Sequence, residues 1–140
     1  MVNSSLKQNH TDIRPQYWLF RLLPKSWHPY GLMARWDRPI GWWLLLLPTL
    51  WGLALVNLTS PNLDSMLYVK YAILFWVGAV AMRGAGCVWN DITDRHLDGS
   101  VERTKHRPLP AGLVTVGQAY VFMAVQCAIG LWVLFALPPY

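Results

Sequence analysis

The segment from Asn90 to Pro110, NDITDRHLDGSVERTKHRPLP, places many charges between two strongly apolar stretches. Its acidic and basic side chains are Asp91, Asp94, Asp98, Glu102, Arg95, Arg103, Lys105 and Arg107. Mg²⁺ prefers oxygen ligands and is usually held by one or two carboxylates together with the phosphates of a substrate. Arginine and lysine side chains bind phosphate oxygens. Acidic residues followed closely by basic ones therefore predict a Mg²⁺-dependent site for a diphosphate.

The acidic residues also have a helical spacing. If the helix of the preceding apolar residues continues past Trp89, a rotation of about 100° per residue places an amide and three carboxylates on one stripe. These candidate metal ligands are Asn90, Asp91, Asp94 and Asp98. Carboxylates on one stripe repel one another unless a cation lies between them. A solvated loop of salt bridges is the alternative, but it does not explain this register. Gly99 is expected to end the helix.

The composition is typical of a membrane protein rather than a soluble domain. Apolar residues make up 54% of the 140 residues, nine are Trp, and charged residues make up 14%, whereas soluble proteins have about 25% charged residues. Three stretches have about the length of ~20 apolar residues that crosses a bilayer, namely 40–58, 67–89 and 111–137. We therefore predict an all-α membrane protein with three transmembrane helices. The net charge of +5 indicates lipid headgroups or an anionic substrate as partners, not nucleic acid.

Lysine and arginine residues predict the orientation in the membrane. The segment 1–38 carries Lys7, Arg14, Arg21, Lys25, Arg35 and Arg38, and the loop 90–110 carries Arg95, Arg103, Lys105 and Arg107. The loop between the first two spans carries neither lysine nor arginine. Because positive loops stay inside, segment 1–38 and loop 90–110 are expected on the cytoplasmic side of a bacterial inner membrane, or on the matrix side in a mitochondrion. Residues 39–140 then form the membrane domain, with 90–110 as its catalytic loop.

The pattern NDxxDxxxD followed by VxRTKxRPLPxG resembles the UbiA superfamily of intramembrane prenyltransferases, and within it the members that act on 4-hydroxybenzoate. The stretch LLPKSWHPYGLMARWDRPIGWWLLLLPTLWGL resembles the family's entry into its first helix, and MRGAGCVWNDITDR the end of its second. The resemblance covers residues 22–112 and, more loosely, the rest of the chain. Trp42 departs from the family, in which a smaller Thr is expected at this position.

The resemblance implies the N-terminal part of an all-α bundle of about nine helices, built from two halves with one Asp-rich motif each. It implies Mg²⁺-dependent transfer of a polyprenyl group from a polyprenyl diphosphate to the ring of 4-hydroxybenzoate in ubiquinone synthesis. This sequence has no second DxxxD motif. The chain is therefore expected to be a portion of the enzyme that needs further C-terminal helices for a complete site and is inactive alone.

Matching the motif residue by residue assigns the polar side chains. The resemblance implies that Asn90, Asp94 and Asp98 hold Mg²⁺, with Asp91 beside them. Arg103 and Arg107 match bases that bind the diphosphate, and Lys105 is a further candidate. Arg95 matches a position in the substrate pocket. Asp94, Asp98 and Arg95 are accordingly the expected catalytic residues.

Arg83 is a candidate on physical grounds. It lies roughly 10 Å deeper than Asn90 on the same stripe, and a buried intramembrane arginine is by default a functional hypothesis. We predict that Arg83 binds the carboxylate of the aromatic acceptor, with Arg38 as a second candidate. The alternative is that Arg83 pairs with Asp37 or with lipid headgroups. Three tryptophans could shield the allylic cation, although lipid-facing packing is the alternative for the first two: Trp42, Trp43 and Trp89.

Two other functions stay open from the sequence. A UbiA-type enzyme could prenylate haem or another quinone precursor, because most of the acceptor pocket would be built by helices outside this chain. A non-catalytic membrane protein with three spans is the alternative from a different class. Cys87 and Cys127 lie in apolar segments and are expected to be packing residues.

Overall fold

The computed structural model describes residues 18–59 and 64–137. Within these ranges the chain is helical and has no strand, so the predicted all-α class is confirmed. The 3₁₀ helices are η1 (Trp18–Arg21) and η2 (Lys25–Trp27), and the α-helices are α1 (His28–Met33), α2 (Ile40–Thr59), α3 (Ser65–Thr93), α4 (Arg95–Ser100) and α5 (Val116–Ala136). Lys7 and Arg14, which contribute to the predicted orientation, lie outside the described residues.

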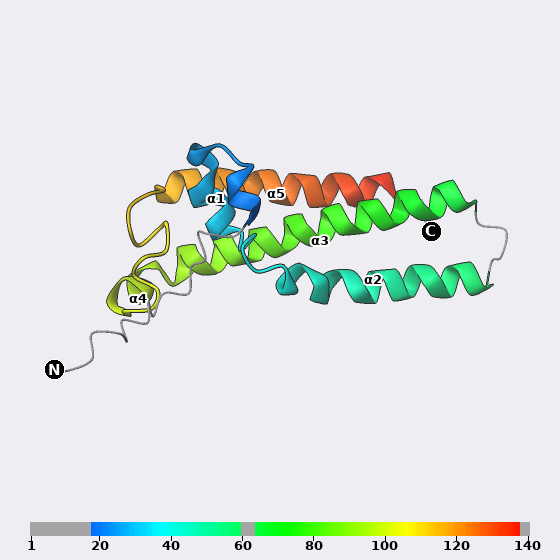
Figure 1. Ribbon diagram of the computed structural model, residues 1–140, viewed down its shortest axis with the longest axis horizontal. Helices are drawn as coiled ribbons and strands as arrows, with labels where there is room; N and C mark the ends of the chain where they lie inside the picture. The colour runs from blue at the N-terminus through cyan, green and yellow to red at the C-terminus, as the bar shows by residue number, and fades with distance from the viewer. Residues whose placement is uncertain (1–17, 60–63, 138–140) are drawn as a thin grey trace.

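Three helices are long and apolar enough to cross a membrane, namely α2, α3 and α5. They run side by side, with α3 between α2 and α5 (Figure 1). The third predicted span, 111–137, begins too early, because α5 starts only at Val116. Gly112 turns the chain with a φ of +72°, and Thr115 then caps α5. The Thr115 hydroxyl accepts a hydrogen bond from the backbone N–H of Gln118, and the side-chain carbonyl of Gln118 accepts one from the backbone N–H of Thr115. This reciprocal pair is a capping box.

A buried cluster holds the charged end of the molecule together. Its members come from α1, α3, the loop after α4 and α5: Met33, Val88, Ile92, Leu109, Val114 and Ala119. The Tyr30 ring also packs on Phe122, with centroids 5.2 Å apart. Because Leu109 and Val114 are anchored in this cluster, the basic loop is folded back against the end of α3 instead of extending into solvent.

The end of α3 bends where the sequence predicted a continuous helix. The helix passes Trp89 as expected but ends at Thr93, and Asp94 leaves helical geometry with a φ of −90° and a ψ of 3°. The short helix α4 then points in a new direction (Figure 1). Gly99 does not end the helix, since α4 continues to Ser100. A helical stripe drawn from Arg83 is therefore valid only up to this bend.

The turn between α1 and α2 contains a residue in an unusual backbone conformation. The Trp36 amide donates to the Gly31 carbonyl at 3.0 Å, and the Arg35 amide donates to the Leu32 carbonyl at 3.2 Å. These bonds form a Schellman motif, which requires a left-handed residue at the position that Arg35 occupies. Arg35 has a φ of +57°, although this position usually holds glycine. The turn sends the chain from α1 into α2 beside the end of α3.

Candidate active site

A cavity of about 500 Å³ lies where the start of α2, the end of α3 and the loop after α4 meet. Its volume is within the range of small-molecule sites, about 300 to 1,000 Å³. Five arginines line it: Arg35, Arg38, Arg83, Arg103 and Arg107. Its remaining lining residues are Ile40, Gly41, Cys87, Asn90, Asp91 and Asp94. The cavity therefore joins oxygen ligands to a group of guanidinium groups, as an anionic substrate with a metal requires.

The structure brings together most of the site residues predicted from the sequence. Seven of them line this cavity: Arg38, Arg83, Asn90, Asp91, Asp94, Arg103 and Arg107. Arg83, Asn90 and Asp91 are presented by α3 itself, which supports the predicted stripe up to the bend. Three predicted residues do not line the cavity: Arg95, Asp98 and Lys105. These three lie on α4 or in the following loop, beyond the bend at Asp94.

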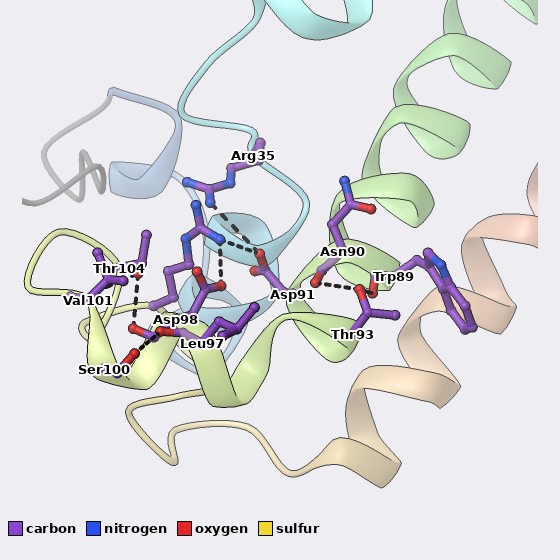
Figure 2. Close-up of polar contacts among 11 residues, drawn as sticks. Arg35, Trp89, Asn90, Asp91, Thr93, Leu97, Asp98, Ser100, Val101 and Thr104 are labelled. Carbon is purple, nitrogen blue, oxygen red and sulfur yellow. Dashed lines mark hydrogen bonds and ion pairs between the residues drawn. The ribbon is translucent and has the colours of Figure 1, made fainter.

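Arg107 ties the basic loop to the acidic motif. Its Nη1 atom donates to Asp98 Oδ2 at 2.7 Å and to Asp91 Oδ1 at 3.1 Å. Figure 2 shows Asp91 and Asp98 converging on this guanidinium group. Asp91 is only 2% exposed and Asp98 9%. One arginine thus binds two carboxylates that the sequence placed among the metal ligands.

Arg35 is a residue of the cavity that sequence reasoning missed. Its Nη2 atom lies 3.9 Å from Asp91 Oδ1, and the labelled pair is seen in Figure 2. From the sequence, Arg35 is only one of the basic residues of segment 1–38 that predict the membrane orientation. Its position shortly before α2 is a local signal, but only the fold shows that it faces the end of α3.

Arg83 and Gly41, which both line the cavity, lie against each other. A Cβ atom built on Gly41 would overlap Nε of Arg83 and would lie 3.1 Å from its Cζ. The Arg83 guanidinium therefore lies against the backbone of the first turn of α2, but Arg83 as a whole is exposed in this chain, where the sequence predicted a buried arginine. Nearby, Arg38 Nε lies 3.9 Å from Oδ2 of the buried Asp37. The two candidates for carboxylate binding, Arg83 and Arg38, thus line the same cavity.

The remaining polar candidates have local contacts. Arg95 Nη1 donates to the Ile92 carbonyl at 3.4 Å, next to the bend. Lys105 Nζ lies 2.7 Å from Glu102 Oε1 in an exposed ion pair. Thr104, which no prediction singled out, is buried and its hydroxyl donates to the Asp98 carbonyl at 3.0 Å. Thr104 therefore connects the basic loop to α4 without reaching the cavity wall.

The tryptophans favour packing over cation shielding. Trp42 stacks on Trp43 with ring centroids 4.8 Å apart and meets the edge of Trp76 at 6.3 Å. Trp43 and Trp76 are both exposed in this chain. Trp89 is also exposed and extends from α3 on the side away from Asp91 (Figure 2). None of these four rings is among the residues that line the cavity.

The donors suit a hard divalent cation only in part. Within residues 18–59 and 64–137, no three His, Cys, Asp or Glu side chains are close enough to hold a metal. Asn90 and Asp94 are exposed and line the cavity, so their oxygens fit a Mg²⁺ ion that takes its other ligands from water and phosphate.

Comparisons with known proteins identify the family of this chain. The family model of the UbiA prenyltransferase family matches residues 45–140. The chain is 38% identical to "4-hydroxybenzoate polyprenyltransferase, mitochondrial" of Arabidopsis thaliana over 134 residues, which are 96% of this chain and 32% of that protein. It is 50% identical to the 4-hydroxybenzoate octaprenyltransferase of Providencia stuartii over 99 residues, 71% of this chain and 32% of the relative.

A plant relative gives a similar result. The chain is 43% identical to 4-hydroxybenzoate geranyltransferase 1 of Lithospermum erythrorhizon over 135 residues, which are 96% of this chain and 42% of that protein. The matches thus span between 32% and 42% of these relatives' length. No solved structure matches the chain. The family match covers more than half of the chain and includes the whole acidic and basic motif, so the chain belongs to the UbiA prenyltransferase family.

Proposed function

We propose that the protein takes part in the transfer of a polyprenyl group from a polyprenyl diphosphate to the ring of 4-hydroxybenzoate, a reaction of ubiquinone synthesis. The observation that carries this proposal is one cavity at the end of a membrane helix, lined by Asn90, Asp94 and five arginines. The three relatives described above are named for transfer to 4-hydroxybenzoate. Their names favour this acceptor over haem or another quinone precursor.

The diphosphate belongs at the outer part of the cavity. We assign Arg103 and Arg107 to its phosphate oxygens, with Lys105 as a further base at the rim. Asn90, Asp94 and Asp98 are proposed to hold Mg²⁺. Bound Mg²⁺ supplies positive charge that stabilises the diphosphate as it departs. For Asp98 this role requires that its carboxylate share or exchange its contact with Arg107.

The acceptor belongs deeper, next to Arg83. Arg83 lies roughly 10 Å from Asn90 along α3, which leaves room for one aromatic ring between a carboxylate held by Arg83 and the diphosphate. Arg38 borders the same region and can take part in binding the carboxylate. The allylic C–O bond breaks with its electron pair on the diphosphate, a ring carbon bonds to the allylic cation, and the ring loses a proton. Arg95 stays a candidate catalytic residue by resemblance.

The membrane orientation follows from where the charges lie. The 3₁₀ helices, α1, the start of α2, α4 and the start of α5 all lie at one end of the bundle (Figure 1). In the described residues that follow α1, every lysine or arginine except Lys70 and Arg83 belongs to this end. We propose that it faces the cytoplasm across a bacterial inner membrane, or the matrix in a mitochondrion.

We propose that a complete enzyme needs a second acidic motif from helices that this chain does not contain. The test is a chimera in which this chain replaces the matching segment of the Lithospermum erythrorhizon relative, since that match covers 96% of the chain. Purified chimera, Mg²⁺, geranyl diphosphate and 4-hydroxybenzoate should give prenylated 4-hydroxybenzoate. An inactive chimera that is inserted and folded would contradict the proposed function.

The 140-residue chain should be assayed beside the chimera. Alone it should form no product, because one acidic motif leaves much of the charge on the departing diphosphate uncompensated, and a loss of ~4 kcal/mol slows a reaction about a thousandfold. Adding the remaining segment of the relative as a separate polypeptide should restore product. Turnover by the short chain alone would overturn the requirement for a second motif.

A further inference from the structure

Asp91 is buried at the edge of a cavity whose other acidic residue, Asp94, is exposed. Its Oδ1 atom accepts a hydrogen bond from Arg107 Nη1 at 3.1 Å and lies 3.9 Å from Arg35 Nη2. The two arginines come from opposite sides of α3 in the sequence, one before α2 and one after α4. Asp91 is therefore the point at which the entry turn and the basic loop are joined to the membrane helix.

We propose that Asp91 is a positioning residue, which holds Arg35 and Arg107 at the cavity wall so that they receive the diphosphate, and that it does not bind the metal. The inference rests on the proposed function and extends it to one residue of the acidic motif. It assigns different tasks to carboxylates that the sequence alone treats as equivalent. Asn90 and Asp94 face the cation, whereas Asp91 faces the bases.

The contacts of Asp91 favour arginines over a metal. Mg²⁺ keeps several water molecules and takes ligands that water can reach, and the Asp91 side chain is only 3% exposed. Two guanidinium groups already approach its Oδ1 atom, and a divalent cation on the same oxygen would be repelled by both. Asp94 also lines the cavity but differs from Asp91 in being exposed.

The geometry of Arg107 allows it to hold a phosphate while it is itself held. A guanidinium group presents five N–H donors in a rigid plane. The bonds to Asp91 and Asp98 both use the same nitrogen, Nη1, so the carboxylates fix the plane from one corner. Arg107 lies 16 residues after Asp91 in the sequence. Its second carboxylate partner, Asp98, belongs to the short helix α4 and not to the membrane helix α3, so Asp91 is the contact that ties Arg107 directly to α3.

The backbone of Arg35 gives a second reason for an anchor. A non-glycine residue in the left-handed conformation carries a cost and persists where surrounding contacts determine it. Arg35 adopts this conformation with a φ of +57° while its side chain meets Asp91. The strained turn and the ion pair therefore together direct the Arg35 guanidinium toward the cavity.

The test is binding of inorganic pyrophosphate to the chimera in EDTA, so that arginines bind the anion without metal. Asp91→Asn keeps the shape of the side chain and removes its charge. Asp94→Asn is the matched control, with the same change at an exposed position. If Asp91 positions the arginines, Asp91→Asn weakens pyrophosphate binding about tenfold, as expected for the loss of a charge-assisted hydrogen bond. Asp94→Asn leaves binding unchanged or strengthens it, because it removes a repelling charge.

The direction in which Asp91→Asn changes pyrophosphate affinity distinguishes a positioning role from simple charge repulsion. If Asp91 acted only through its negative charge, Asp91→Asn would strengthen pyrophosphate binding, and the inference would be overturned. Failure of the unsubstituted chimera to bind pyrophosphate would overturn it as well. The two proposals can fail separately. If Asp91→Asn weakens pyrophosphate binding in a chimera that does not prenylate 4-hydroxybenzoate, the inference is supported and the proposed function is not.

A second measurement tests the metal assignment directly. Mn²⁺ binding is measured by titration, followed by the electron paramagnetic resonance signal of the ion. The Mn²⁺ affinity of Asp91→Asn should be within about twofold of that of the unsubstituted chimera. The Mn²⁺ affinity of Asp94→Asn should be about tenfold weaker, since only this substitution removes a carboxylate ligand. Equal losses in the two variants would make Asp91 a metal ligand and overturn the inference. In the Arg107→Met background, Asp91→Asn can act only through Arg35. It should therefore weaken pyrophosphate binding less than it does when Arg107 is present, because the effects of coupled residues are not additive.

Discussion

Gly41 lies against the guanidinium group of Arg83, so closely that a Cβ atom at position 41 would overlap Arg83 Nε. The contact joins the first turn of α2 to the part of α3 that is proposed to hold the acceptor. An arginine side chain is flexible, so a larger residue at position 41 would displace the guanidinium group instead of unfolding the helix pair. The contact therefore matters for where the positive charge sits.

Gly41→Ala should raise the KM for 4-hydroxybenzoate about tenfold in the chimera, the size expected when a hydrogen bond to a charged group is lost. The KM for geranyl diphosphate should change much less, because Arg103 and Arg107 are not displaced. Gly52→Ala is the matched control, since Gly52 lies in the same helix with nothing within 4 Å of its Cβ position. Equal effects of the two substitutions on the acceptor KM would show that Gly41 does not position Arg83.

Asp94→Ala should lower prenyl transfer about 100- to 1000-fold, the usual effect of removing one stabiliser of transition-state charge. Membrane insertion should be unchanged because the Asp94 side chain is exposed and outside the buried cluster. Asp98→Ala should lower prenyl transfer at least as much. It should in addition loosen the basic loop, because Asp98 accepts a hydrogen bond from Arg107 at 2.7 Å. Rates should be compared with limited proteolysis of the loop. Near-normal turnover of either variant at saturating Mg²⁺ would contradict the metal assignment.

Cys87 should react with an anionic thiosulfonate reagent from within the cavity that it lines. The surrounding arginines attract such a reagent. Pyrophosphate with Mg²⁺, at about ten times its Kd, should slow the reaction about tenfold by occupying the cavity. Cys127 on the apolar helix α5 is exposed in this chain, and its reaction should not depend on pyrophosphate. Single-cysteine variants and mass spectrometry distinguish the two thiols, and equal protection of both would argue against a cavity ligand.

Arg35→Gly and Arg35→Ala both remove the ion pair with Asp91, but they differ in the backbone. Glycine adopts the left-handed conformation without strain, whereas alanine pays roughly 1–2 kcal/mol. Thermal unfolding of the 140-residue chain in detergent should therefore show Arg35→Gly to be more stable than Arg35→Ala by about that amount. In an ordinary helix the order is reversed, since alanine is favoured over glycine by about 1 kcal/mol. That reversed order at position 35 would contradict the left-handed turn.

Much of the fold could be predicted from the sequence. Two of the three spans coincide with helices α2 and α3, since runs of uncharged residues identify membrane helices. The predicted start of the third span was too early, because Gly112 and Thr115 form a turn before α5 begins. This turn is a local signal that hydropathy alone does not detect. The placement of Asn90, Asp91 and Asp94 beside one cavity follows the helical repeat, which is also a local property.

The sequence by itself determined the features that depend on neighbouring residues. These are the membrane helices, the stripe on α3 up to Thr93, and the basic residues that follow it. Tertiary structure decided which charges meet. The bend at Asp94 moved Asp98 out of the cavity wall, and the folded-back loop brought Arg107 onto Asp91 across 16 residues. The turn at Arg35 brought a second guanidinium group to the same carboxylate. These contacts join segments that are distant along the chain, and their geometry depends on how helices pack, so no periodicity of the sequence encodes them.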